Sequence, residues 1–151
     1  MKLIVSITMM FLVTCSFAQV QWTSIHDLDD SLKVKEKPVV VKIYTDWCGY
    51  CKMMDAKIFE NKGFTKKVGS DYYFVALNAE RNEKITFNGV EYNYLLRNGG
   101  RGIQKLALQL GEVEGRISYP TVVLLNPDYS QKKKINGYVR KPDFLFWLNV
   151  D

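Results

Sequence analysis

The chain has 151 residues, which is enough for one globular domain and little more. Hydrophobic residues make up 47% and charged residues 25%, as is usual for a protein with a packed core, and the formal net charge is +5. Because that charge is spread along the chain and no nucleic-acid-binding motif accompanies it, nucleic acid is not an expected partner. Three cysteines are also too few for a structural disulfide framework.

Residues 1–18 are predicted to be a secretory signal peptide. Lys2 is followed by a short apolar run, and the small residues Ser16 and Ala18 make a cleavage site after residue 18. The apolar run is shorter than a membrane span, which favours a cleaved signal over an uncleaved anchor. The end of the run also faintly resembles a bacterial lipoprotein box, so a lipid anchor on Cys15 is a second interpretation.

The predicted mature domain, 19–151, keeps few side chains that could ligate a metal. It holds only two cysteines, Cys48 and Cys51, and one histidine, His26. A structural zinc site needs about four ligands, so no metal site is expected. An export signal together with a single closely spaced cysteine pair indicates an oxidising compartment, because disulfides persist there.

Helices and buried strands alternate in the first half of this domain. Residues 39–45 form a nearly continuous apolar run rich in β-branched side chains, which is typical of a buried central strand. The predicted order is a helix over 24–35, a strand over 39–45, a helix over 49–61 with a further turn over 64–68, and a strand over 72–77. This order implies a right-handed crossover and a parallel pair of strands.

The second half is predicted to add an antiparallel pair of strands and a last helix. Two turn signals, Asn88-Gly89 and Asn98-Gly99-Gly100, come first, and the earlier one suggests a small hairpin. The pattern then predicts a helix over 103–113, a strand over 122–125, an antiparallel partner over 132–136 and a final helix that opens at Pro142. We therefore expect an α/β protein whose central mixed β-sheet is flanked by helices.

The hexapeptide Trp47-Cys48-Gly49-Tyr50-Cys51-Lys52 lies where the first strand ends and the next helix begins. Two thiols three positions apart at a strand-to-helix junction are the arrangement of a dithiol/disulfide redox centre. A helix N-terminus lowers the pKa of a thiol from about 8.5, because free N–H groups and the helix dipole favour negative charge there. Cys48 lies at that terminus, and Cys51 lies one turn further in, where it can attack a mixed disulfide.

These elements, the hexapeptide and the distant Tyr119-Pro120-Thr121 together resemble the thioredoxin superfamily over most of residues 22–150. The segment 46–55 is most similar to secreted bacterial thioredoxin-like proteins and to the C-terminal periplasmic domain of the disulfide reductase DsbD. The resemblance implies a thioredoxin fold in which residues 78–118 contain an insertion before the strand that follows the proline. It also implies a place in the bacterial cell envelope, with the periplasm as the expected location.

The resemblance assigns a role to each residue near the motif. Cys48 would attack a substrate disulfide, and Cys51 would resolve the mixed disulfide. Pro120 would be a cis-proline facing the disulfide, and Tyr119 would offer backbone hydrogen bonds to a bound peptide. The rest of the expected substrate surface is Trp47, Gly49 and Tyr50. The implied partners are protein disulfides and a membrane-bound electron donor or acceptor, and we expect a monomer that needs no diffusible cofactor.

The sequence departs from the family pattern next to the cysteines. Lys42 stands where thioredoxin has a buried aspartate, six residues before the first cysteine. A lysine near the thiols would stabilise thiolate and favour an oxidant, whereas a lysine that extends into solvent would touch nothing. Lys52 could likewise tune the pKa of the thiols or be an ordinary solvated side chain. Gly49-Tyr50 also replaces the Gly-Pro of thioredoxin.

The insertion admits two interpretations. Aromatic and arginine side chains in it could form a substrate-recognition cap, or they could be ordinary packing and surface residues. The residues concerned are Tyr92, Tyr94, Arg97 and Arg101.

From these observations we predict a thiol–disulfide oxidoreductase of the cell envelope that acts as a reductase. The alternative from another class is a thioredoxin-fold binding module, or a copper chaperone whose thiolates hold Cu(I) without redox turnover. A purely structural Cys48–Cys51 bond is a third interpretation, but so short a loop gains little stability from closure.

Overall fold

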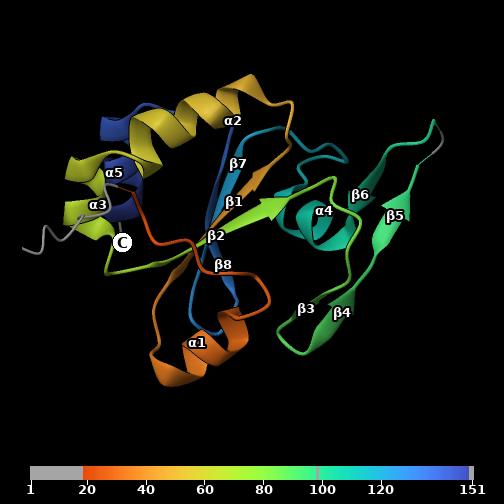
Figure 1. The fold of residues 1–151 in the computed structure, drawn as a ribbon, viewed down its shortest axis with the longest axis horizontal. Helices are drawn as coiled ribbons and strands as arrows, with labels where there is room; N and C mark the ends of the chain where they lie inside the picture. The colour runs from red at the N-terminus through yellow and green to blue at the C-terminus, as the bar shows by residue number, and fades with distance from the viewer. Residues whose placement is uncertain (1–18, 98, 150–151) are drawn as a thin grey trace, which may run out of the picture.

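The computed structural model describes residues 19–97 and 99–149, and Figure 1 shows their arrangement. The predicted signal peptide over 1–18, including Cys15, lies outside the described residues. Within the described residues, no helix is long and apolar enough to cross a membrane.

A four-stranded mixed sheet lies at the centre of the fold, in the order β2-β1-β7-β8. The strands run over Val39–Tyr44 (β1), Tyr73–Asn78 (β2), Thr121–Leu125 (β7) and Gln131–Asn136 (β8). β1 pairs in parallel with β2 and antiparallel with β7, which in turn pairs antiparallel with β8. The predicted parallel pair and the predicted antiparallel partner are both confirmed.

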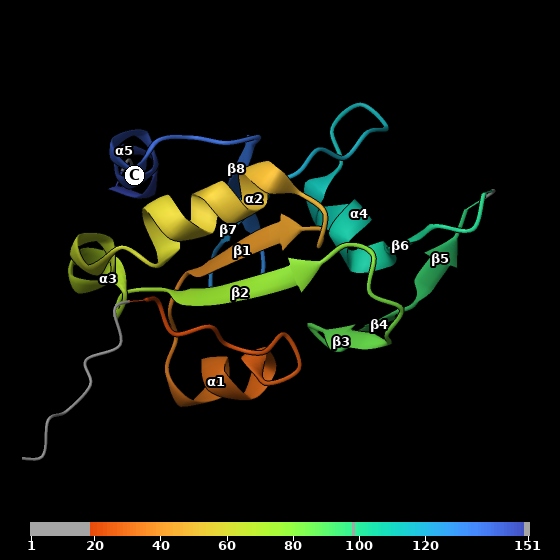
Figure 2. The ribbon, with the colours of Figure 1, turned by 45° about the horizontal axis from the view of Figure 1, so that its top comes forward.

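Helices cover both faces of this sheet, as Figure 2 shows. The helices α1 (Leu28–Val34) and α4 (Lys105–Gly111) pack on one face. The other face is covered by α2 (Gly49–Met54), its π-helical continuation η1 (Asp55–Phe59), α3 (Lys62–Val68) and α5 (Lys141–Asn149). The protein therefore has the predicted layers of helix, sheet and helix.

β1 is buried on both faces because its alternate side chains enter two different cores. Val41 and Ile43 pack with α1 and α4, whereas Val40 packs with α2, α3 and α5. The second core is rich in fully buried aromatic side chains, which are Phe59, Phe64, Phe74 and Phe144. Because β1 is fixed from both sides, the segment that follows it is held at one edge of the sheet.

The first two helices differ from the prediction at their ends. The first begins at Leu28 and not at Ser24, because Ser24 Oγ accepts a hydrogen bond from the His26 backbone N–H at 3.2 Å within a preceding turn. The helix predicted over 49–61 widens after Met54, where the backbone N–H of Glu60 bonds to the carbonyl of Asp55, five residues earlier, at 2.9 Å.

Residues 78–118, which are predicted to contain an insertion, form α4 and, before it, two small antiparallel sheets. The first is the predicted hairpin, with β3 (Ile85–Phe87) and β4 (Val90–Tyr92) joined through Asn88 and Gly89, which have φ of 51° and 70°. The second joins β5 (Tyr94–Leu96) to β6 (Gly102–Gln104) and projects from the body of the protein as an arm (Figures 1 and 2). The helix predicted from Ile103 therefore begins at Lys105, because Ile103 pairs with Leu95 across this arm.

Candidate redox site

Cys48 and Cys51 are joined by a disulfide at the N-terminal end of α2, with their Cα atoms 5.3 Å apart. Cys48 is the N-cap residue of this helix, and its Sγ accepts a hydrogen bond from the backbone N–H of Cys51 at 3.1 Å. A sulfur that accepts a helix N–H is placed where negative charge is favoured, because the first N–H groups of a helix lack partners. The site therefore suits a Cys48 thiolate once the disulfide is reduced.

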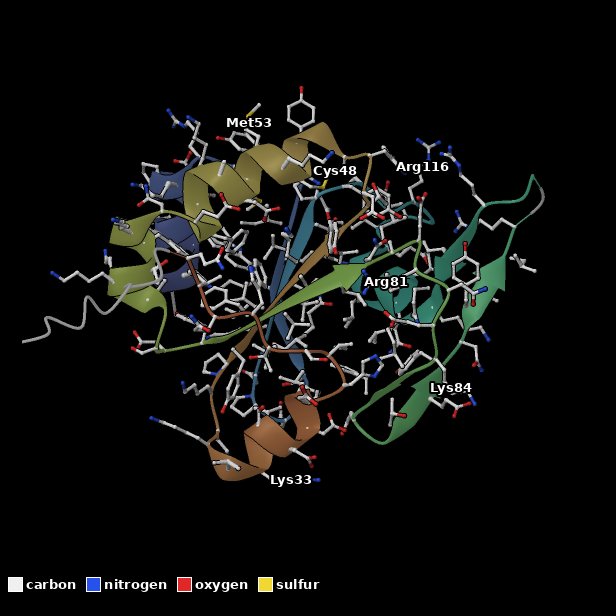
Figure 3. All side chains as sticks on the ribbon, in the orientation of Figure 1. Lys33, Cys48, Met53, Arg81, Lys84 and Arg116 are labelled. Atoms are coloured by element: carbon white, nitrogen blue, oxygen red, sulfur yellow. A yellow bond between two sulfur atoms is a disulfide. The ribbon has the colours of Figure 1, made fainter. Side chains whose placement is uncertain are left out.

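The two cysteines are buried beneath a rim of exposed apolar side chains. Cys48 is 5% exposed and Cys51 is 1% exposed. Around them Trp47 is 59% exposed, Tyr50 63% and Met53 43%. Large apolar groups are usually buried, so this cluster next to a reactive bond marks a surface that a partner can cover. Figure 3 shows Cys48 and Met53 on the same outer side of the molecule, along α2.

Part of this rim is hollowed. Gly49, Tyr50 and Met53 line an open depression of about 410 Å³, and the ring of Tyr50 lies 6.4 Å from that of Tyr138. Apart from its chain neighbours and the backbone of α2, no atom lies within 4 Å of the Cβ position of Gly49, so this side of the residue is open to a bound chain.

The loop before β7 meets the rim from the other side. Its Tyr119–Pro120 peptide bond is cis, as the resemblance implies. The Tyr119 ring packs edge-on against Trp47 with 5.9 Å between ring centroids. Burial raises the pKa of the Tyr119 hydroxyl, Glu80 raises it further, and Arg97 acts in the opposite direction. Tyr119 therefore stays a neutral side chain. It contacts the motif through Trp47 and is influenced by the charges of Glu80 and Arg97.

The last residue of β2, Asn78, and Glu80 shortly after it fix the orientation of the motif. Trp47 Nε1 donates a hydrogen bond to Glu80 Oε2 at 2.8 Å, and Asn78 Nδ2 donates to Asp46 Oδ1 at 3.0 Å. The sequence analysis missed both contacts. These contacts could have been expected from the predicted fold, because the carboxyl ends of the parallel strands β1 and β2 meet at the same edge of the sheet.

Lys42 is not the solvated lysine that one of its two interpretations expects. Its side chain does not extend into solvent, because the residue is 3% exposed. Its ammonium group forms an ion pair with Asp55, one helical turn after Cys51, so its charge is compensated. The ammonium also lies 4.8–5.7 Å from the ring centroids of three aromatic residues, which are Trp22, Tyr44 and Phe59.

Lys52 is exposed at the surface of α2, and no other described residue pairs with it. Over the described ranges, no group of three or more His, Cys, Asp or Glu side chains is placed to hold a metal ion. The structure thus brings together the motif, Tyr119 and Pro120 at one edge of the sheet, and it pairs Lys42 with Asp55.

Comparison with known proteins identifies the family. The model of the thioredoxin-like domain family matches residues 27–150. The chain belongs to the thioredoxin-like family. In sequence it is 38% identical to Thioredoxin-T of Drosophila melanogaster over 68 residues, which is 44% of this chain and 40% of that protein.

Two solved structures with TM-scores above 0.5 show the same thioredoxin fold, and a third has a score just below 0.5. The DsbH oxidoreductase superposes with a TM-score of 0.57 and 16% identity over 87% of this chain and 83% of that one. The Drosophila melanogaster thioredoxin Deadhead gives a TM-score of 0.54 and 18% identity over 87% of this chain and 99% of that one. The reduced C-terminal domain of DsbD from Neisseria meningitidis gives 0.49 and 21% identity over 80% and 86%.

Proposed function

We propose that this thioredoxin-like protein is an exported thiol–disulfide oxidoreductase that reduces disulfides in other proteins. One observation carries the proposal: the Cys48–Cys51 disulfide caps α2 beneath exposed apolar side chains, and the cis Tyr119–Pro120 loop contacts the same rim through Trp47. A structural crosslink would need neither an open apolar rim nor an anion-stabilising helix end beside one of its sulfurs.

The reaction consists of two thiol–disulfide exchanges. In the reduced protein, the Cys48 thiolate attacks one sulfur of a substrate disulfide, so a Cys48–substrate bond forms and the other substrate sulfur leaves as thiolate. Cys51 then gives up its proton and attacks Cys48 Sγ, which releases the second substrate thiolate and forms the Cys48–Cys51 disulfide. Two electrons pass to the substrate, whose thiolates take up protons from water.

The remaining roles follow from the positions of the side chains. Trp47, Tyr50 and Met53 would cover the apolar surface of a substrate, while Gly49 and the backbone of Tyr119 would leave room for its chain. The ion pair with Asp55 compensates the positive charge of Lys42, which removes one reason to expect an oxidant. Lys52 keeps both of its interpretations, tuning of the thiol pKa and an ordinary solvated side chain, and its exposure on α2 favours the second.

The site must be reduced again after each turnover. We propose a membrane-bound dithiol protein as the electron donor, because the buried sulfurs require a partner that fits the same rim. The sequence of residues 1–18 supports export, with the periplasm as the location and a lipid anchor on Cys15 as the alternative. We propose that the protein acts as a monomer.

Trapping of substrates tests the proposal. A Cys51→Ser variant should accumulate proteins on Cys48 as mixed disulfides, because the second exchange is blocked while the first proceeds. The matched Cys48→Ser variant should trap none through this site, because Cys51 lies one turn further into α2 and is the less exposed of the two, at 1% against 5% for Cys48. Trapped species are counted on non-reducing gels and released with dithiothreitol.

Two results would reject this assignment. Equal trapping by both variants would contradict the division of roles between the cysteines. If neither variant traps a partner and the pair shows no reversible couple in thiol buffers, the protein is a binding module, a copper carrier or a structurally crosslinked domain.

A further inference from the structure

The β5–β6 arm carries positive charge that nothing within the described protein neutralises. From residue 92 to residue 111 the sequence has three cations and no acidic residue. These cations, Arg97, Arg101 and Lys105, are all exposed. In the part of the chain that the structure describes, none of the three makes a side-chain hydrogen bond or ion pair.

Two of these cations flank the turn at the tip of the arm. Leu96 pairs with Gly102, and Arg97 and Arg101 are the residues next to this last pair, where the Gly100 backbone N–H donates to the Arg97 carbonyl at 3.3 Å. The segment 97–101 contains no carboxylate that could pair with either arginine. An anionic group bound beside the two guanidinium groups would gain charge-assisted hydrogen bonds.

The arm has a fixed shape. Gln104 is fully buried, and its side-chain amide donates to the carbonyls of Glu83 and Tyr92 at 3.3 and 3.2 Å. The Gly102 backbone N–H donates to the Tyr94 hydroxyl at 2.7 Å across the arm. The arm is therefore attached to the body of the protein through buried contacts, and its strands have a defined position.

The same contacts place the arm beside the redox site. The backbone N–H of Gln104 donates to the carbonyl of Ala79 at 2.7 Å, and the next residue, Glu80, holds Trp47. The charge of Arg97 is close enough to influence the Tyr119 hydroxyl. In Figures 1 and 2 the arm projects past the sheet edge at which α2 begins, and in Figure 3 Arg116 lies between Cys48 and the arm.

The loop between α4 and β7 is not the source of the positive charge. It contains Glu112 and Glu114 as well as Arg116, so its own charge is not positive. The arm also offers an apolar contact, because Leu96 next to Arg97 is 79% exposed. A partner that fits this surface has carboxylates together with an apolar side chain, which is the chemistry of an acidic polypeptide segment.

We propose that the β5–β6 arm binds acidic segments of substrate proteins, so that the protein prefers disulfides whose cysteines have carboxylate neighbours. The inference rests on the proposed function, since it names the substrates of the same Cys48–Cys51 site. The occupant is an extended acidic segment that reaches from the apolar rim to the two arginines.

Three synthetic peptides test the proposal. They share one internal disulfide and differ only at the positions beside each cysteine, which hold Glu, Gln or Lys. The rate constant for oxidation of the reduced protein by each peptide is measured by acid quench at low and high salt. Each value is divided by the rate of reduction by dithiothreitol, which removes the effect of the neighbours on the reactivity of the peptide disulfide itself.

We expect the Glu peptide to react about tenfold faster than the Lys peptide at low salt, with a difference that shrinks at high salt. The double variant Arg97→Gln/Arg101→Gln should lose most of this preference and keep its rate with the Gln peptide. The control Lys66→Gln/Lys67→Gln removes the same charge from two exposed residues on α3, far from the arm, and should keep the preference.

Other results separate the two claims. Equal normalised rates with all three peptides, or equal losses in both double variants, would overturn the acidic preference and leave the oxidoreductase intact. If no peptide oxidises the protein, the proposed function itself fails.

Discussion

At the scale of the residue, the ion pair of Lys42 with Asp55 is the contact that most changes the view of the site. A lysine that is 3% exposed at the centre of a sheet needs a partner for its ammonium group, because an unpaired buried charge is costly. Asp55 supplies that partner from η1, and its side chain is 28% exposed. The two partners are therefore not equivalent, since Asp55 can still be hydrated if its partner is removed.

This asymmetry gives a prediction on stability. Asp55→Asn should lower the free energy of unfolding by about 2–4 kcal/mol, because it leaves the Lys42 ammonium buried without a counter-charge. Lys42→Met should cost less, about 1–2 kcal/mol, since an apolar chain of similar length fills the same aromatic surroundings and Asp55 stays in contact with water. Urea unfolding of the oxidised proteins compares the two variants. Equal losses of unfolding free energy in the two variants would contradict the asymmetry between the two partners.

At the scale of the element, the β5–β6 arm depends on a glycine inside a strand. A Cβ on Gly102 would lie 2.2 Å from the Leu95 carbonyl oxygen and 2.5 Å from the Tyr94 ring. Gly102→Ala should therefore separate β5 from β6 and expose the arm to proteolysis while the central sheet stays folded. Gly100→Ala is the matched control, because its Cβ meets nothing within 4 Å and carries only the strain of φ +87°, about 1 kcal/mol. Limited proteolysis reports the outcome, and equal resistance of the two variants would contradict it.

The arm also shows where prediction from the sequence ended. β1, β2 and β7 were predictable because a buried strand leaves a continuous apolar run, and Asn88-Gly89 specified its hairpin through local backbone preference. Residues 102–104 instead resembled the start of a helix, since Ile103 has helical spacing with the apolar residues after it. Pairing with β5 makes that segment a strand instead of a helix. This pairing depends on contacts between strands, which a local sequence pattern does not contain. For the same reason the motif at Cys48 was predicted, whereas its contact through Glu80 was not.

At the scale of the whole molecule, the direction of the redox reaction depends on the relative stabilities of the oxidised and reduced folded forms. The reduction potential of the cysteine pair differs between the folded protein and the unfolded chain. The difference is set by how much the unfolding free energies of the oxidised and reduced forms differ, and 30 mV corresponds to about 1.4 kcal/mol. In the oxidised form both sulfurs are buried, and Cys48 Sγ caps α2. The charge of Lys42 is compensated, so the helix end is the main source of stabilisation for a Cys48 thiolate in the described protein.

A reductase therefore requires that the oxidised form be the more stable one. We expect a reduction potential below roughly −220 to −260 mV, the poise of cytosolic glutathione determined by biochemical extraction. We also expect a higher urea midpoint for the oxidised protein than for the reduced protein. The potential is measured in glutathione and dithiothreitol buffers and the midpoints on each form separately, so the two results check each other through the same thermodynamic cycle. A potential above the glutathione couple with a more stable reduced form would make the protein an oxidant, because the Cys48 thiolate would then be stabilised by more than the end of α2.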